Sequence, residues 1–397
     1  MKIKTKIFIG IAFFYIAFCV FPAFAHLIPP GIPGVVVCSV LISMYYKLVF
    51  NNRTMIWFLL YCLVTATFVF FGREIKIDIG PCRNFYQLII EYAFLLPNIL
   101  ISLILINSDD FKVNKILGHG SFALLMVSFV LVLPYMGQMD LRDMAHDDES
   151  AMTTTLGYTL LHAYIIILPA LYYCFSSFNN RWRSVYFVGI LILIYVILKS
   201  SITTEIILLV IVLPLSIINS SKNKTKASLL LLLFMLIAFV IYISGALVTL
   251  LEVIRPFFEG TAVEEKIDSF QITLTTGSSA GSISVREDKH NVSLNSFFNN
   301  IIIGGGLTGG HSSILDRLGG MGLVGFIPYF MMYFSLCKQW YIKIYKPTNR
   351  YYLLGAISAL VLLYTKGIFG QEGNLFLMVL LPVFLFLPAA QGKIQKF

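Results

Sequence analysis

Long apolar runs separated by short polar segments occupy almost the whole chain. A helix needs about 20 mainly apolar residues to cross a lipid bilayer. About twelve runs approach this length, and we expect each to form a transmembrane helix, although Lys199 and Glu205 crowd the junction of the seventh and eighth. The runs lie near residues 6–25, 32–50, 55–72, 86–106, 120–137, 156–176, 184–199, 203–218, 228–250, 313–337, 351–369 and 374–390.

The composition agrees with a membrane protein. Of the 397 residues, 58% are hydrophobic and only 12% are charged, and the mean hydropathy is +0.84. Soluble domains carry about 25% charged residues. We therefore expect an all-α fold in which residues 1–397 form a single integral membrane domain, a polytopic bundle of about 12 transmembrane helices.

The distribution of basic residues predicts the orientation of the bundle. If the N-terminus lies in the cytoplasm, the cytoplasmic segments hold 18 of the 29 Lys and Arg residues but only Asp109 and Asp110 among the 20 acids. Such an excess of bases is typical of cytoplasmic loops. We expect both termini to be cytoplasmic. The net charge of +9 then reflects topology and gives no indication of nucleic-acid binding.

One segment on the outer side is unusually long and runs from residue 251 to residue 312. Unstructured loops longer than about 15 residues are usually functional or disordered. This segment mixes charges with a Gly/Ser tract at 277–284, and its aromatic and aliphatic stretch at 294–303 predicts a short amphipathic or re-entrant helix. We interpret the segment as a long periplasmic loop within the membrane domain.

A glycine-rich run at residues 304–310 leads from this loop into the tenth apolar run. Glycines such as Gly304 and Gly310 let the backbone approach a ligand closely, so we assign both a supporting role. His311 follows at the membrane boundary, and histidine is the side chain whose proton is most easily tuned near neutral pH. His311 is therefore a candidate catalytic residue, although a single histidine near a helix end is also a common structural hydrogen-bonding group.

The sequence Ser313-Ile314-Leu315-Asp316 fits a helix capping pattern. It predicts a helix that starts at Ser313, with Asp316 bonding back to the first turn. The positive end of that helix is a favourable place for a phosphate. Arg317 in the same turn has the wrong sign for the helix dipole, so we expect Asp316 or a bound phosphate to offset its charge.

Three further bases, Arg286, Arg255 and Lys199, are predicted to lie at the outer surface. Each alone fits a solvated or snorkelling side chain. Together with Arg317 they predict a cationic patch suited to the pyrophosphate head group of a lipid. Glu91 lies within an apolar run, where a charge is costly. It indicates either a functional group or a buried salt bridge to one of these cations.

Other catalytic motifs are missing from the sequence. The glycine run lacks the Lys-Ser/Thr ending of a nucleotide-binding P-loop, and no nucleophile elbow is present. No group of His and carboxylate residues has the spacing of metal ligands. We therefore expect neither nucleotide hydrolysis nor a metal site.

Residues 286–326 combine several motifs in one order. Arg286 comes first, followed by Leu294-Asn295-Ser296-Phe297-Phe298-Asn299-Asn300-Ile301-Ile302-Ile303-Gly304, then Gly310-His311-Ser312-Ser313-Ile314-Leu315-Asp316, and finally Gly322-Leu323-Val324-Gly325. This order resembles the bacterial polysaccharide repeat-unit polymerases of the Wzy type, which make O-antigen or capsule, within the wider group that includes the O-antigen ligases. Two positions depart from the family: Ile301 stands where a proline is common, and Lys199-Ser200-Ser201 stands where many relatives show Ser-Arg.

The resemblance implies a metal-independent glycosyltransferase of the bacterial inner membrane that uses no cofactor. It implies transfer of the growing glycan from polyprenyl diphosphate to another lipid-linked repeat unit on the periplasmic face. Arg286 and Arg317, with Arg255 or Lys199, would neutralise the developing diphosphate charge. His311 would orient the reacting groups or act as a base. The implied partners are the lipid-linked oligosaccharide, membrane lipid and, optionally, a chain-length regulator protein, with no nucleic acid.

Two alternatives stay open. An O-antigen ligase uses the same kind of donor, and His290-Asn291 matches the His-Asn form common in ligases, although it lacks the downstream Gly-x-x-Gly. A lipid-linked oligosaccharide flippase or a proton-coupled transporter would need polar groups near the middle of its spans. For that purpose the sequence offers only Glu91 and Glu205, both toward the outer edge.

Overall fold

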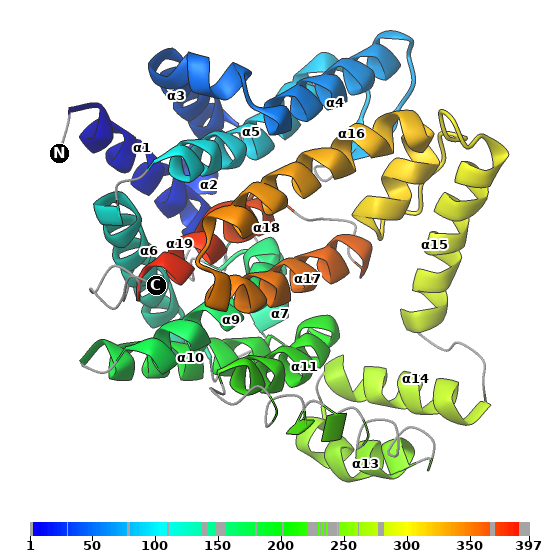
Figure 1. Ribbon diagram of the computed structural model, residues 1–397. Coiled ribbons are helices and arrows are strands. Elements are labelled where there is room, and N and C mark those ends of the chain that lie inside the picture. The colour runs from blue at the N-terminus through cyan, green and yellow to red at the C-terminus, as the bar shows by residue number, and fades with distance from the viewer. Residues whose placement is uncertain are drawn as a thin grey trace.

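Most of the chain is helical. The computed structural model describes residues 3–29, 31–77, 80–108, 111–136, 141–147, 149, 156–178, 181–200, 202–220, 246–260, 262–276, 282–365 and 370–388, with a few single positions between 225 and 244. Within these residues, eight helices are long and apolar enough to cross a membrane. They are α1 (Ile3–Val20), α3 (Ile32–Phe50), α4 (Arg53–Phe70), α5 (Phe85–Asn107), α6 (Phe111–Val132) with η1 (Leu133–Tyr135), α9 (Tyr158–Ser177), α10 (Arg181–Lys199) and α16 (Ser313–Lys343). The prediction of a helical, multi-pass membrane protein is confirmed (Figure 1).

Shorter helices complete the bundle. They are α11 (Thr203–Asn219), α17 (Asn349–Thr365), and the continuous run of α18 (Gln371–Leu375), the π-helix η4 (Phe376–Leu380) and α19 (Leu381–Phe386). One-turn pieces are α2 (Ala23–Leu27), α7 (Leu141–His146) and η3 (Lys346–Thr348). The helix predicted near 120–137 begins earlier, at Phe111, because lysine is a good helix former and Lys112 and Lys115 continue the helix. The run predicted at 228–250 lies largely outside the described residues.

The long connection before α16 is helical over much of the part that is described. It contains α13 (Ala246–Ile254), η2 (Arg255–Phe258), α14 (Ala262–Thr276) and α15 (Ser282–Asn299). The helix predicted over 294–303 is wrong in its bounds, because α15 starts in the polar sequence upstream and ends at Asn299. Three of the glycines that follow, Gly304, Gly306 and Gly310, adopt positive φ, which is incompatible with a continued α-helix. Most of the Gly/Ser tract at 277–284 lies outside the described residues.

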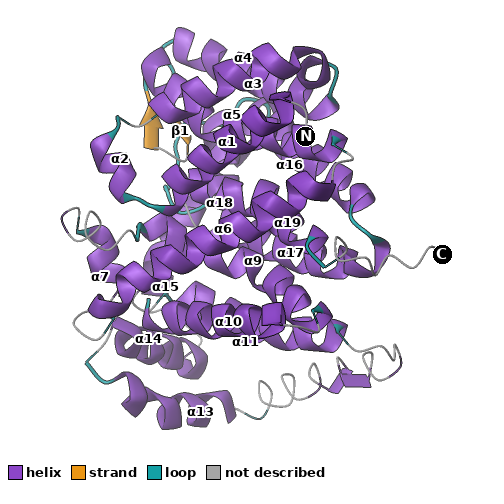
Figure 2. Cartoon of the chain, turned by 90° about the vertical axis from the view of Figure 1, so that its left-hand side faces the viewer, coloured by secondary structure: helices purple, strands orange, loops and turns teal. Residues whose placement is uncertain are grey.

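A small hairpin lies at one end of the bundle. Strands β1 (Ile75–Ile77) and β2 (Gly80–Cys82) pair antiparallel, with Ile75 opposite Cys82 (Figure 2). β1 packs against α16 and β2 against α5. The side chains of Ile75 and Cys82 are fully buried. The hairpin therefore fixes the segment between α4 and α5 onto the end of the bundle where α16 begins.

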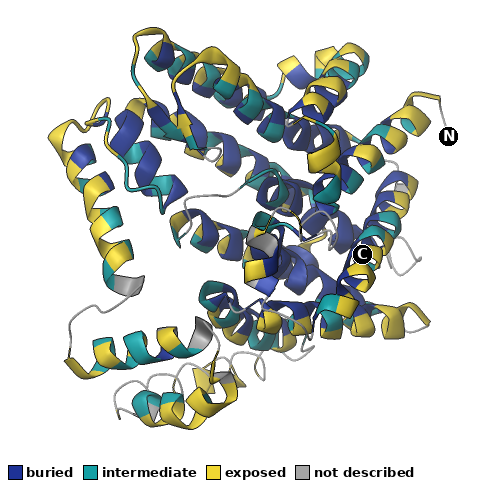
Figure 3. Cartoon of the chain, turned by 180° about the vertical axis from the view of Figure 1, so that it is seen from behind, coloured by how far each residue is buried: buried dark blue, intermediate teal, exposed yellow. Residues whose placement is uncertain are grey.

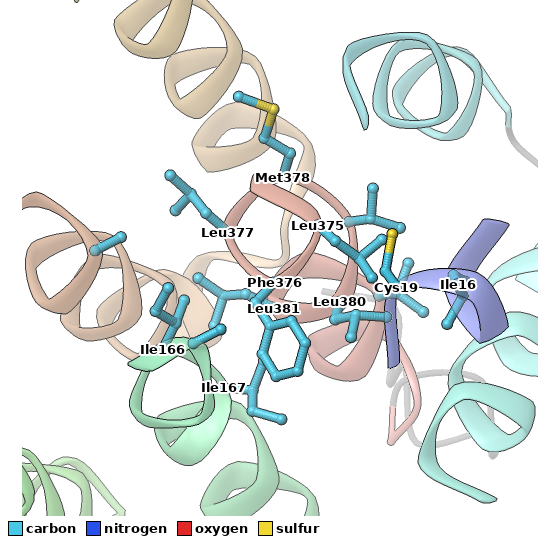
Figure 4. Packing of buried hydrophobic residues seen from close by; sticks show 14 of the residues in the cluster. Ile16, Cys19, Ile166, Ile167, Leu375, Phe376, Leu377, Met378, Leu380 and Leu381 are labelled. Atoms are coloured by element: carbon cyan, nitrogen blue, oxygen red, sulfur yellow. The ribbon is translucent and has the colours of Figure 1, made fainter. Parts of the chain in front are cut away.

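The hydrophobic core is centred on α9 and the C-terminal run. α9 packs against α10, α11, α17 and α19, and it is buried without interruption from Leu160 to Leu171. Ile166 and Ile167 of α9 face Phe376 and Leu381 of the C-terminal run (Figure 4). A helix that is apolar on all sides belongs in such a core. The exposed side chains lie toward the periphery, and they are dense on α13, α14 and α15 (Figure 3).

Candidate functional site

The first turn of α16 is closed by side-chain caps. The Ser312 hydroxyl accepts a hydrogen bond from the Leu315 amide at 3.1 Å, so Ser312 is the N-cap and Ser313 is the first helical residue. The predicted helix start at Ser313 is confirmed. Asp316 bonds back to the start of the helix as predicted, because its Oδ2 accepts the Ser312 amide at 3.4 Å.

Asp316 also connects α15 to the glycine-rich loop, which we define as residues 300–312. Its Oδ1 accepts the Ser293 hydroxyl at 2.8 Å and the Gly310 amide at 3.0 Å. The Asp316 side chain is buried. A buried carboxylate is tolerated when hydrogen bonds satisfy it, and here the donors come from two segments, α15 and the glycine loop. Asp316 therefore holds the glycine loop in place.

Gly322 interrupts α16 one and a half turns beyond Arg317. Its backbone has φ 58° and ψ −159°, which is not helical. The freed amides of Leu323 and Val324 donate to the carbonyls of Ile301 and Ile302, at 2.9 and 3.0 Å. The glycine loop thus caps the second part of α16 in the way that a capping residue closes an ordinary helix. This break explains the first glycine of the Gly-x-x-Gly motif.

The space around the break leaves no room for a side chain at either contact position. A Cβ on Gly322 would stand 2.4 Å from the Gly304 amide nitrogen, and one on Gly304 would stand 2.5 Å from the Gly319 carbonyl. Ser296 fixes the same region, since its hydroxyl donates to the Gly319 carbonyl and accepts the Leu307 amide, both at 2.9 Å. The glycine loop is therefore a packed element with a defined shape.

Two cations from the hairpin segment lie against this loop. Arg73 donates a hydrogen bond to the Gly304 carbonyl, and its guanidinium lies 5.1 Å above the ring of Phe68. Lys76 lies against Gly310, since a Cβ there would stand 2.3 Å from Lys76 Nζ. Neither residue was identified as a site residue from the sequence. Their positive charge could have indicated them, because they lie in an outer segment and Lys and Arg are usually enriched in cytoplasmic segments.

Two more cations approach the loop from α15. Lys289 Nζ lies 2.8 Å from His311 Nε2. Burial lowers the pKa of His311, and the nearby positive charges of Lys289 and Arg286 lower it further. An ammonium group can only donate. His311 is therefore neutral at pH 7, with Nε2 as the acceptor and the ring proton on Nδ1.

Arg317 is buried beneath the loop. Its guanidinium contacts Glu91 Oε1 at 3.4 Å, donates to the Ser313 carbonyl at 3.0 Å and lies 3.8 Å above the ring of Tyr329. Only 1% of the residue is exposed. The acid found beside Arg317 is therefore Glu91, where we expected Asp316 or a phosphate. Of the two roles considered for Glu91, the buried salt bridge to one of the predicted cations is confirmed.

Arg255 and Lys199 lie on other elements. Arg255 is exposed and pairs with two acids of α14, Asp268 at 2.7 Å and Glu264 at 3.0 Å. Lys199 is exposed at the end of α10. In Figure 1 α10, α13 and α14 lie below the junction of α15 and α16. The four cations of the predicted patch therefore do not all come together. The cations at the glycine loop come from the hairpin segment and α15, whereas Arg255 pairs with acids of α14.

The assembled site is a donor-rich surface, which we call the cationic loop site. It consists of the glycine loop with His311 and four cations, Arg73, Lys76, Arg286 and Lys289. Two exposed acids, Glu287 and Asp288, share α15 with these cations. In the described part of the chain no three His, Cys or acidic residues are grouped to hold a metal ion. Such an arrangement suits an anion with several oxygens, such as a diphosphate.

Comparison with known proteins adds no family to this description. No family model matches the chain, and no curated protein matches it. The chemistry of the site is therefore inferred from its own residues.

Proposed function

We propose that this protein is a membrane glycosyltransferase that polymerises lipid-linked oligosaccharide repeat units, as in the synthesis of O-antigen or a similar surface polysaccharide. The donor is a growing glycan on polyprenyl diphosphate, and the acceptor is the sugar end of another lipid-linked repeat unit. The observation that carries the proposal is the convergence of four cations from two separate segments on one glycine loop beside a membrane helix. A lipid diphosphate matches that charge and that location.

The proposal includes a topology of about twelve spans with both termini in the cytoplasm. The eight long apolar helices and the shorter apolar helices support it, as does the placement of 18 of the 29 bases in alternate connections. In that orientation the cationic loop site faces the periplasm from the bacterial inner membrane. In a cysteine-free background, a membrane-impermeant maleimide is expected to label Asp288→Cys and to spare Lys346→Cys until the membrane is opened.

In the proposed reaction the bond between the donor sugar and the diphosphate breaks, and a hydroxyl of the acceptor sugar forms the new glycosidic bond. Negative charge grows on the leaving diphosphate, and fixed cations stabilise that charge most effectively in a water-poor site. Arg73, Lys76, Arg286 and Lys289 are the groups we assign to this role. The acceptor hydroxyl loses a proton as the bond forms.

His311 is the base that we propose for this proton. Its Nε2 is the acceptor for the Lys289 ammonium in the absence of substrate. A diphosphate attracts the same ammonium more strongly, because it offers a full negative charge. Binding of the donor would therefore draw Lys289 away and free Nε2 of a neutral imidazole for the acceptor hydroxyl.

One observation favours a second candidate, a lipid-linked oligosaccharide flippase. His162 of α9 and Glu205 of α11 form a hydrogen-bonded pair that is buried in the bundle. Buried ionisable pairs of this kind serve proton-coupled transport in other membrane proteins. An O-antigen ligase is the remaining alternative, since it shares the donor and differs in the acceptor. Purified protein supplied with the lipid-linked repeat unit alone separates the polymerase from both alternatives, because only a polymerase makes longer lipid-linked chains from it.

A further inference from the structure

An exposed apolar surface adjoins the cationic loop site. In and beside the glycine loop, Phe298, Ile302 and Leu307 are 67%, 65% and 67% exposed. On the neighbouring end of α4, Phe70 and Phe71 are 72% and 77% exposed, and their ring centroids are 5.5 Å apart. We call these five residues the apex surface. Scattered exposed apolar side chains are ordinary, whereas a group at a functional site marks an interaction surface.

The hydrogen bond between Arg73 and Gly304 joins the apex surface to the cations. Arg73 follows Phe71 by two residues, and Gly304 follows Ile302 by two. One contact therefore fixes a guanidinium at the glycine loop, close in sequence to both apolar groups. An amphiphile with an anionic head and an apolar tail fits this juxtaposition, because its head and tail need opposite surroundings.

The apolar surface continues along α16. Leu323 and Val324 are bonded through their amides to the glycine loop, and both side chains are exposed. Three more exposed side chains, Ile327, Phe330 and Phe334, follow at helical spacing, so the five residues form one stripe. We call them the α16 stripe. At 1.5 Å per residue the stripe is about 17 Å long.

We propose that the lipid substrate reaches the cationic loop site sideways from the bilayer, with its diphosphate at the loop and the first part of its tail on the apex surface and the α16 stripe. The identity of the head group rests on the proposed function. Drawing an isoprenoid tail out of the bilayer would expose its apolar surface to water, which is unfavourable. A lateral route keeps the tail in apolar surroundings while the head group meets the cations.

The first experiment compares two donors in nanodiscs, one with a long polyprenyl tail and one with a water-soluble two-isoprene tail. The double variant Phe298→Ser with Ile302→Ser should raise KM for the long-tailed donor by roughly tenfold and leave KM for the short-tailed donor unchanged. Phe257→Ser is the matched control, because Phe257 is also exposed but lies on η2. Equal effects on both donors, or no effect on the long-tailed donor, would overturn the lateral route. A wild-type protein that elongates neither donor would instead count against the proposed function.

The second experiment tests binding without catalysis. Photoreactive polyprenyl diphosphate that carries no sugar is added to the protein in nanodiscs, and the cross-linked peptides are mapped by mass spectrometry. We expect cross-links within residues 298–334 or at Phe70 and Phe71, and expect them to exceed several-fold those made by the matching polyprenyl alcohol. Equal cross-linking by the alcohol would mean that the surface meets only bulk lipid, and cross-links confined to other helices would place the tail elsewhere. Either result overturns the inference.

Discussion

Lys289 Nζ and His311 Nε2 lie 2.8 Å apart, and this contact adds to the effect of burial in lowering the pKa of the imidazole. An ammonium beside a ring nitrogen disfavours a second positive charge there. The pair also links α15 to the glycine loop, because Lys289 belongs to the helix and His311 to the loop. A change at Lys289 should therefore be detected at His311.

Replacing Lys289 with methionine should raise the pKa of His311 toward its ordinary value. Burial and Arg286 would still lower it, but the charge of Lys289 would be gone. If His311 acts as a base, activity falls once the ring is protonated, so the acid limb of the pH profile of kcat/KM should move to higher pH in Lys289→Met. The pKa itself can be followed by NMR of ring-labelled histidine. Lys346→Met, which removes an exposed lysine beyond the other end of α16, should leave both readouts where they are; a profile that does not move in Lys289→Met contradicts the assignment of His311 as base.

Lys76 should contribute to catalysis although it is more than 200 residues from His311 in sequence. It lies against Gly310, and loss of one fixed group that stabilises developing charge costs about 100-fold in rate. We therefore expect Lys76→Met to lower kcat/KM by about that factor without lowering the amount of protein in the membrane. Arg255→Met is the comparison, because Arg255 pairs with Asp268 and Glu264. Similar losses of activity in the two variants would show that the loss of any positive charge on this side lowers activity, and would contradict a specific role for Lys76.

Gly322 should not tolerate alanine. Its φ of 58° is unfavourable for any residue with a Cβ, and the added carbon would stand 2.4 Å from the Gly304 nitrogen. The strain alone costs about 1–3 kcal/mol, and relief of the contact must displace the glycine loop. We expect Gly322→Ala to lower the melting temperature in detergent and to abolish elongation. Gly10→Ala is the matched change, since nothing lies within 4 Å of the new carbon; normal elongation by Gly322→Ala would mean that the shape of the loop is not needed.

Glu91 and Arg317 should depend on each other for stability. Removing one member of a buried ion pair costs about 3–5 kcal/mol, because the other charge stays buried. Glu91→Gln and Arg317→Met should each lower the melting temperature strongly, and the double variant should lose much less than the sum of the two. Additive losses in this double-mutant cycle would indicate that the 3.4 Å contact contributes little.

The length of the apolar runs was enough to place most of the membrane helices. A run of about 20 apolar residues is a strong signal because the bilayer requires it. The hairpin at Ile75–Cys82 escaped prediction, since three-residue strands carry no usable period. The break at Gly322 was also not predicted. A glycine within an apolar run is compatible with a regular helix, and only the loop that packs against Gly322 shows that the helix is interrupted there.

The candidate site was predictable only where it is local in sequence. Asp316 and the start of α16 followed from a capping pattern that spans four residues. Arg73 and Lys76 could not be assigned, because their approach to the glycine loop depends on how the hairpin packs against α16. The ion pair between Arg317 and Glu91 was one of two alternatives. A buried cation pairs with an acid or with a ligand, and the sequence does not show which of them lies nearer.

The most direct test of the proposed function is a reaction of purified protein with lipid-linked repeat unit alone. Both donor and acceptor are then present, and the cations supply the charge stabilisation. We predict a ladder of longer lipid-linked chains in the absence of nucleotide and of divalent metal, with the ladder forming much more slowly in Lys76→Met. A ladder that requires a divalent metal, product that forms only after addition of a separate acceptor such as lipid A core, or transport of the lipid across the membrane with no new glycosidic bond, would contradict the polymerase assignment.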